Sequence, residues 1–287
     1  MIVRKLGDNK PKVLIFQGSP RDEDTCAGME SKTHKIVKYI KSKWSPFVNF
    51  HEIDLSVNQS KRPIIQPCKG CISTAGGYHC HFDCSCYFKG DKEKPDLLKE
   101  ADVYKLLQEC DAFIIVSPIH WHSLTSQVKL LFDRLVCINQ TLTIDDAKKL
   151  MGDSNIKNSE ITGKFSKSGK YDNMLRNHLE GKVGAFYVHG DDGADDYEGK
   201  ELPESYSDVF DDGFSNNPKN VVMPFVMQLK YSGVFVPDEL IQAFYVNKGL
   251  NYYVANQKFN KEKEFFDRAD DLIENILIYL EENKIEL

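Results

Sequence analysis

Apolar residues along this chain form short runs, and the segments between the runs carry apolar residues at helical spacing. The runs are nearly continuous in three places, which is typical of strands covered on both faces. Two further runs are shorter or only partly alternating. From these runs we predict strands at residues 12–17, 47–55, 111–117, 182–189 and 234–236 with 242–246.

Between the predicted strands, apolar positions repeat every three or four residues, which predicts amphipathic helices. The predicted helices cover residues 31–45, 101–110, 124–135, 221–231 and 262–282. Strands that alternate with helices favour a parallel sheet with helices on both faces. Five strands in this alternation fit a doubly wound α/β fold with strand order 2-1-3-4-5, whose crevice lies at the carboxyl ends of the strands.

Three polar segments interrupt this pattern. Residues 56–95 are irregular and rich in cysteine, residues 139–180 resemble a surface insertion, and residues 191–217 begin with an acidic stretch. The acidic stretch lacks the spacing of a calcium loop, so a solvated loop is favoured over a cation site. We therefore predict a single domain over residues 1–287 with a long cysteine-rich loop and two insertions.

Charge and hydropathy exclude several classes of function. The formal net charge is −6 and no basic stripe is present, which argues against a nucleic-acid or anionic membrane partner. No apolar stretch approaches the roughly 20 residues that span a bilayer, and the first residues have no signal-peptide pattern. We expect a soluble, cytoplasmic protein.

Polar residues follow the first predicted strand at a turn and at the start of the next helix. Hydroxyls and backbone N–H groups at a helix N-terminus form a natural phosphate cradle, although an ordinary capped turn uses the same residue types. The candidates are Ser19, Arg21, Ser31, Lys32 and Thr33.

The loops after the third and fourth strands carry groups suited to a flat heteroaromatic ligand. Alone, each group has a simpler structural explanation, since a tryptophan is usually core and a histidine is usually a satisfied structural side chain. The candidates are Pro118, Ile119, His120, Trp121 and His122 in the first loop, and His189, Gly190 and Asp191 in the second.

Taken together, the motifs resemble one known family. The motifs are GSPR (18–21), SKT (31–33), SPIHW (117–121), KLLFDR (129–134) and YVHGD (187–191). They resemble the NADPH-dependent FMN reductase group of flavodoxin-like proteins, over roughly residues 12–190. The resemblance implies a flavodoxin-like fold and a non-covalent FMN, with its phosphate on residues 19–33 and its ribityl chain and ring against residues 118–122 and 189–191.

The same resemblance implies an oxidoreductase that takes electrons from NAD(P)H and passes them through the flavin to a small-molecule or protein acceptor. It also implies a homodimer or homotetramer, and it identifies no acid–base catalyst. An electron carrier without nicotinamide turnover is the alternative. The chain departs from the family pattern in two places: residues 22–30 expand the phosphate loop, and His120 stands where tyrosine is usual.

Five cysteines lie within the irregular segment, at Cys68, Cys71, Cys80, Cys84 and Cys86. Such a cluster in a cytosolic chain suits Zn²⁺ or an iron–sulfur cluster. Iron–sulfur flavoproteins resemble this chain, but their cysteine spacing is not reproduced here. We therefore favour buried or oxidation-sensitive thiols over a metal site, with a redox dithiol or a metal- and redox-sensing role as further alternatives.

Overall fold

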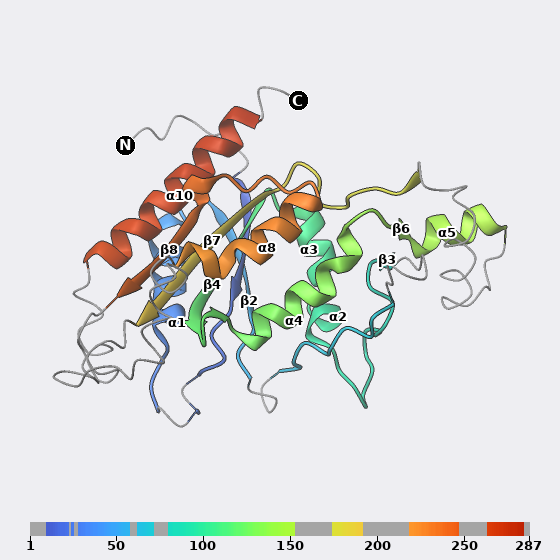
Figure 1. The fold of residues 1–287 in the computed structure, drawn as a ribbon, viewed down its shortest axis with the longest axis horizontal. Coiled ribbons are helices and arrows are strands. Elements are labelled where there is room, and N and C mark those ends of the chain that lie inside the picture. Colours follow the sequence, from blue (N-terminus) through green and yellow to red (C-terminus); the bar gives the residue numbers. More distant parts are fainter. Residues whose placement is uncertain are drawn as a thin grey trace, which may run out of the picture.

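A central parallel sheet organises the computed structural model (Figure 1). The structure describes residues 10–22, 24–25, 28–57, 62–71, 80–152, 174–191, 218–246 and 263–283. The strands of the main sheet are β1 (Lys12–Gln17), β2 (Asn49–Asp54), β4 (Ala112–His120), β5 (Ser123–Leu124), β7 (Val183–Asp191) and β8 (Ile241–Val246). Their order is β2-β1-β4-β7-β8, and β5 adds an antiparallel pair to the end of β4. The predicted order 2-1-3-4-5 is confirmed.

Helices cover both faces of this sheet. The described helices are α1 (Lys32–Trp44), α2 (Leu97–Glu100), α3 (Val103–Glu109), α4 (Ser126–Leu135), α5 (Ile144–Met151), α8 (Lys219–Tyr231) and α10 (Lys263–Asn283), with 3-10 turns η1 (Val136–Ile138) and η4 (Asp238–Leu240). Of these, α5 lies beside β6, away from the main sheet. Helices α1 and α10 pack on one face, and α3, α4 and α8 pack on the other. This arrangement confirms the doubly wound α/β fold.

The strands are apolar almost throughout because successive side chains enter different cores. In β1, Leu14 and Phe16 join the core beneath α3, α4 and α8, whereas Val13 and Ile15 join the core beneath α1 and α10. The neighbouring strand β4 divides its side chains in the same way. A side-chain period of two on a sheet covered by two helix layers therefore gives the continuous runs seen in the sequence.

One predicted strand segment is wrong. Residues 234–236 contribute only an isolated bridge between Phe235 and Val183, whereas β8 begins at Ile241 and pairs with β7 over its full length. Val234 and Val236 are nevertheless buried and pack in the core. A buried segment with a single bridge produces the same apolar signal as a strand, so the sequence pattern could not separate the two.

A second, two-stranded sheet joins the cysteine-rich loop to the insertion after α4. Strand β3 (His81–Phe82) runs parallel to β6 (Leu142–Thr143), beside α5. Figure 1 shows this unit extending from one side of the main sheet. Its inner residues Phe82, Thr141 and Leu179 are buried, so the described part of the insertion is more than a surface loop.

Among the residues that the structure describes, no helix has both the length and the apolar character that a membrane crossing requires.

Candidate functional site

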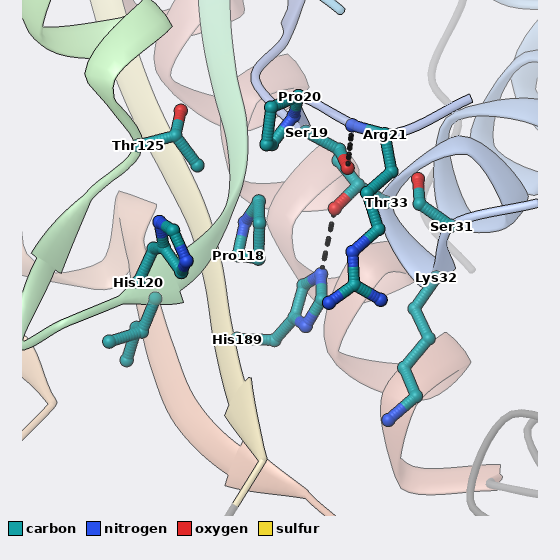
Figure 2. A pocket seen from close by; sticks show the side chains of 11 residues that line it. Ser19, Pro20, Arg21, Ser31, Lys32, Thr33, Pro118, His120, Thr125 and His189 are labelled. Atoms are coloured by element: carbon teal, nitrogen blue, oxygen red, sulfur yellow. Dashed lines mark hydrogen bonds between the residues drawn. The ribbon is translucent and has the colours of Figure 1, made fainter. Parts of the chain in front are cut away.

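The ends of β1, β4 and β7 surround one cavity of about 120 Å³ at the carboxyl edge of the sheet (Figure 2). Its lining residues are Ser19, Pro20, Arg21, Ser31, Lys32, Thr33, Pro118, Ile119, His120, Thr125 and His189. The three loops singled out in the sequence therefore meet, as the geometry of a parallel sheet requires. The parallel register of β4 and β7 sets Pro118 beside His189.

The N-terminus of α1 forms one wall of the cavity. Ser31 is the N-cap, with extended backbone, and its hydroxyl accepts a hydrogen bond from the backbone N–H of His34 at 3.1 Å. The first backbone N–H groups of a helix lack partners within the helix and carry partial positive charge. Lys32 and Thr33 follow directly, so the wall combines N–H groups, a hydroxyl and a cation.

Arg21 adds a second cation to the same cavity. Figure 2 shows its side chain reaching past the Ser31–Thr33 turn toward His189. Arg21 and Lys32 are the charged side chains among the described residues that line the cavity, if the histidines are taken as neutral. An anion is therefore favoured there, because two positive groups and a helix N-terminus act in one direction.

Hydrogen bonds of Gly18 connect the loop after β1 to β4 and to the start of α4. Its N–H donates to the carbonyl of Val116 at 2.7 Å, and its carbonyl accepts from the Thr125 hydroxyl at 2.6 Å. A Cβ added at position 18 would lie 2.5 Å from Cγ2 of Val128, a stiff β-branched side chain in α4. Only glycine fits where the end of β1 passes α4, so the shape of the cavity depends on Gly18.

We expect Gly18→Ala to lower the free energy of unfolding by about 1–3 kcal/mol, because the new methyl overpacks the β1–α4 contact. The first loop would shift and the cavity would lose its shape. Equilibrium urea unfolding measures the loss. Val128→Ala removes the clashing methyl, so the double variant should lose less than the sum of the two single losses, by about 0.5–3 kcal/mol. Additive losses would contradict the steric explanation.

A partly buried polar network lies behind the α1 wall of the cavity. Gln17 accepts the Ser19 N–H at 2.5 Å through Oε1, and its amide nitrogen lies 2.7 Å from Nε2 of His34 and 2.9 Å from the Asp54 carboxylate. The other ring nitrogen of His34 lies 2.9 Å from the Ser31 hydroxyl. Through Gln17 and His34, the network connects Ser19 to Ser31 and holds the two turns that carry these serines in place.

Asp54 anchors this network as a carboxylate. Burial alone would raise the pKa of Asp54, but hydrogen bonds with His34 and with the backbone N–H of Ser56 hold it below its ordinary value. The Arg62 guanidinium also pairs with Asp54 at 2.7 Å. The sequence pattern gave no signal for these partners, because each comes from a different segment of the chain.

His189 closes the cavity on the β7 side. It is buried, and its Nε2 lies 3.0 Å from the Thr33 hydroxyl, so β7 and α1 are connected across the cavity (Figure 2). A Cβ at the following Gly190 would lie 2.7 Å from the Tyr245 ring. Gly190 therefore permits close packing of β7 on β8 and does not line the cavity. The Asp191 side chain lies outside the described residues.

Trp121 and His122 lie away from the cavity in this structure. They form the two-residue turn between β4 and β5, and both have positive φ, 51° and 57°. The Trp121 side chain is 87% exposed. Two left-handed residues in a two-residue hairpin match a turn that usually carries asparagine and glycine, so this turn is strained. Their contact with a flavin stays a prediction.

Two lining residues were missed by the sequence interpretation. Pro20 lies within the predicted turn, and Thr125 caps α4 by accepting from the backbone N–H of Val128. A threonine just before an apolar helix is a recognisable N-cap signal, so Thr125 could have been found. Its hydroxyl serves both as a helix cap and as the hydrogen-bond donor to Gly18.

The clustered cysteines form a separate group. Cys80 and Cys84 are buried, whereas Cys68, Cys71 and Cys86 are half-buried. A hydrogen bond from the Cys86 thiol lowers the pKa of Cys84 to about 5, against the opposing effect of burial. Among the described residues, which omit 72–79, no group of three or more His, Cys, Asp or Glu side chains could hold a metal ion. A metal site there stays a prediction.

Comparison with known proteins identifies relatives of this chain. The sequence profile of a family described as NADPH-dependent FMN reductase matches residues 11–195. No curated protein sequence matches the chain significantly. The solved structure of RosB with bound 8-demethyl-8-formylriboflavin-5'-phosphate is similar, with a TM-score of 0.51, 12% identity, and coverage of 96% of this chain and 80% of RosB.

A second similar structure is the NAD(P)H:quinone oxidoreductase from Methanothermobacter marburgensis. It has a TM-score of 0.48 and 10% identity, with coverage of 91% of this chain and 98% of the other. At 12% identity, the likeness to RosB shows the fold alone, which is flavodoxin-like.

Proposed function

Because the chain belongs to the NADPH-dependent FMN reductase family, we propose that the cavity at the carboxyl edge of the sheet holds FMN non-covalently and serves electron transfer from NAD(P)H to an acceptor. Family membership makes the chain an NAD(P)H-dependent flavin oxidoreductase. The observation that carries the proposal is the convergence of the α1 N-terminus, Arg21 and Lys32 with the β4 and β7 ends on one cavity.

The residues present fit the phosphate end of FMN. Backbone N–H groups at the α1 N-terminus, the Ser31 and Thr33 hydroxyls and two cations supply donors for phosphate oxygens. The cavity of about 120 Å³ is smaller than the roughly 300–1,000 Å³ that enclose a drug-sized ligand. We therefore place the phosphate and adjoining ribityl chain inside it, and the ring at its mouth beside Pro118, Ile119 and His120.

When bound, the flavin supplies the redox chemistry, since its ring accepts a hydride and then reduces the acceptor. The protein's part is to bind and orient. The helix N-terminus and the two cations would hold the phosphate, and the residues at the end of β4 would lie against the ring. His189, buried and 3.0 Å from the Thr33 hydroxyl, forms the β7 side of the cavity and holds the α1 N-terminus against it. We assign no acid–base catalyst.

Anaerobic visible spectroscopy of the purified chain tests this proposal. We expect flavin absorbance, or its appearance after FMN is added and excess is removed by gel filtration. Added NADPH should then bleach it. A protein that takes up no FMN would refute the binding site, and a yellow protein that neither NADH nor NADPH bleaches would be an electron carrier instead. The acceptor is then sought by restoring the colour with quinones, nitro compounds, free flavin or metal ions.

The small-molecule or protein acceptor, the cytoplasmic location and the assembly as a homodimer or homotetramer belong to the same proposal. The resemblance to the family supports the kind of acceptor and the assembly as a homodimer or homotetramer. The absence of a basic stripe supports a partner set without nucleic acid.

A further inference from the structure

The clustered thiols of the cysteine-rich loop lie near the C-terminal end of α4, whereas the cavity lies at its N-terminal end. Thr125, the N-cap of α4, lines the cavity, whereas Arg134 in the last turn contacts the cysteine-rich loop. Ten helical residues span about 15 Å, so the thiols are outside contact with a ligand in the cavity. The thiols therefore do not line the cavity, and their chemistry can be tested without bound flavin.

Within this loop, two thiols lie side by side. The Sγ atoms of Cys71 and Cys86 are 3.1 Å apart, about 1 Å more than the bond length of about 2.05 Å in a disulfide. Both are free thiols in this structure. A small rotation of one side chain would bring the sulfurs to bonding distance.

Several contacts hold the two segments that carry these thiols together. Lys69 donates to the carbonyl of Cys86 at 2.8 Å, and the Tyr87 hydroxyl donates to the carbonyl of Pro67 at 2.8 Å. The buried Arg134 guanidinium lies 4.6 Å from the Tyr87 ring and donates to the carbonyl of Gln66 at 3.0 Å. The thiol pair is thus positioned by its surroundings, which lowers the entropy cost of joining the sulfurs.

Access separates this pair from Cys80 and Cys84, although the Cys84 sulfur accepts a hydrogen bond from the Cys86 thiol. Cys71 and Cys86 are half-buried, so a small reagent can reach them, whereas Cys80 and Cys84 are 6% and 2% exposed. Cys68 is also half-buried, and its sulfur accepts the Gly70 N–H at 3.4 Å. Among the described residues, the pair does not belong to a group able to hold a metal ion.

We propose that Cys71 and Cys86 form a thiol–disulfide exchange site that reacts with low-molecular-weight disulfides. One thiol of the pair, as its thiolate, attacks a sulfur of the small disulfide; a mixed disulfide forms and one small thiolate leaves. The second thiol loses its proton and attacks the protein sulfur of the mixed disulfide, which releases the other small thiolate. Two protein thiols are oxidised and one small disulfide is reduced to two small thiols.

Oxidised glutathione is the probe for this site. The full-length protein is incubated with mixtures of reduced and oxidised glutathione, quenched in acid, alkylated and digested for mass spectrometry. We expect a cross-linked peptide pair joining Cys71 to Cys86, the loss of two alkylatable thiols, and full recovery of both after dithiothreitol. Because the readout is a covalent bond, it does not depend on flavin content, and FMN-free protein should give the same result.

Cys71→Ser and Cys86→Ser should each abolish the cross-link and leave a mixed disulfide with glutathione on the remaining partner. Cys68→Ser is the matched control, because Cys68 has similar exposure in the same loop, and it should leave the Cys71–Cys86 bond unchanged. The proposal is overturned if Cys71 and Cys86 stay free while other thiols oxidise, if either pairs mainly with a third cysteine, or if anaerobically purified protein carries metal that protects them from alkylation.

Discussion

Replacing Arg134 with leucine lowers the free energy of unfolding by about 3–5 kcal/mol, because it leaves a buried carboxylate without its partner. Arg134 and Asp96 form a two-pronged ion pair at 2.9 and 3.1 Å, with both side chains fully buried. Asp96 also accepts the Gln66 N–H at 2.9 Å. The pair therefore joins α4, α2 and the start of the cysteine-rich loop.

Urea unfolding followed by circular dichroism measures this loss at neutral pH. Lys129→Ala is the control on the same helix, since Lys129 pairs with Asp133 at the surface and such pairs contribute about 0–1 kcal/mol. Adding Asp96→Asn to Arg134→Leu should recover part of the loss, because the unpaired charge is removed. A loss below about 1 kcal/mol in Arg134→Leu would mean that water or another group compensates Asp96.

The main sheet could be predicted from the sequence because the residue pattern of each strand reflects the burial of that strand. A strand buried on both faces is apolar at nearly every position, and that pattern is local, as in β1 and β7. The order of the strands followed from the alternation with helices. The apolar segment 234–236 was misread as a strand, since Val234 and Val236 are buried while Phe235 makes only one bridge to the start of β7.

The second sheet could not be predicted, because its strands carry no local pattern. Strands β3 and β6 have two residues each and lie about 60 positions apart in the sequence, so neither carries a periodic signal. Their pairing depends on tertiary contacts, including Phe82 stacked on His178 at 4.1 Å. The Gln17–His34–Asp54 network has the same character, because its members are polar residues from separate segments.

The lining of the cavity was largely predictable, since strand-end loops must meet at one edge of a parallel sheet. Ser19, Ser31 and His189 all line it. Trp121 does not line the cavity, because the turn after β4 leaves it exposed, and its contact with a flavin stays a prediction. The direction of a hairpin turn depends on two left-handed residues, and a Trp-His pair gives no warning of that conformation.

Arg21→Gln weakens FMN binding by roughly 10- to 100-fold and leaves riboflavin binding nearly unchanged. A hydrogen bond to a charged group contributes about 1.5–3 kcal/mol, and about 1.4 kcal/mol corresponds to tenfold in affinity. Riboflavin has the same ring and ribityl chain but no phosphate, so it does not use the Arg21 charge. Glutamine keeps a polar side chain at the rim of the cavity while removing the cation.

Flavin fluorescence titration of both ligands at two ionic strengths separates phosphate recognition from cavity shape. Arg176→Gln is the matched control, because Arg176 pairs with Asp146 on the surface of the insertion and is not among the residues that line the cavity. It should change neither affinity. Equal weakening of FMN and riboflavin by Arg21→Gln would show that Arg21 shapes the cavity instead of binding phosphate. A loss confined to FMN, and smaller at high salt, places the phosphate against Arg21 and the α1 N-terminus.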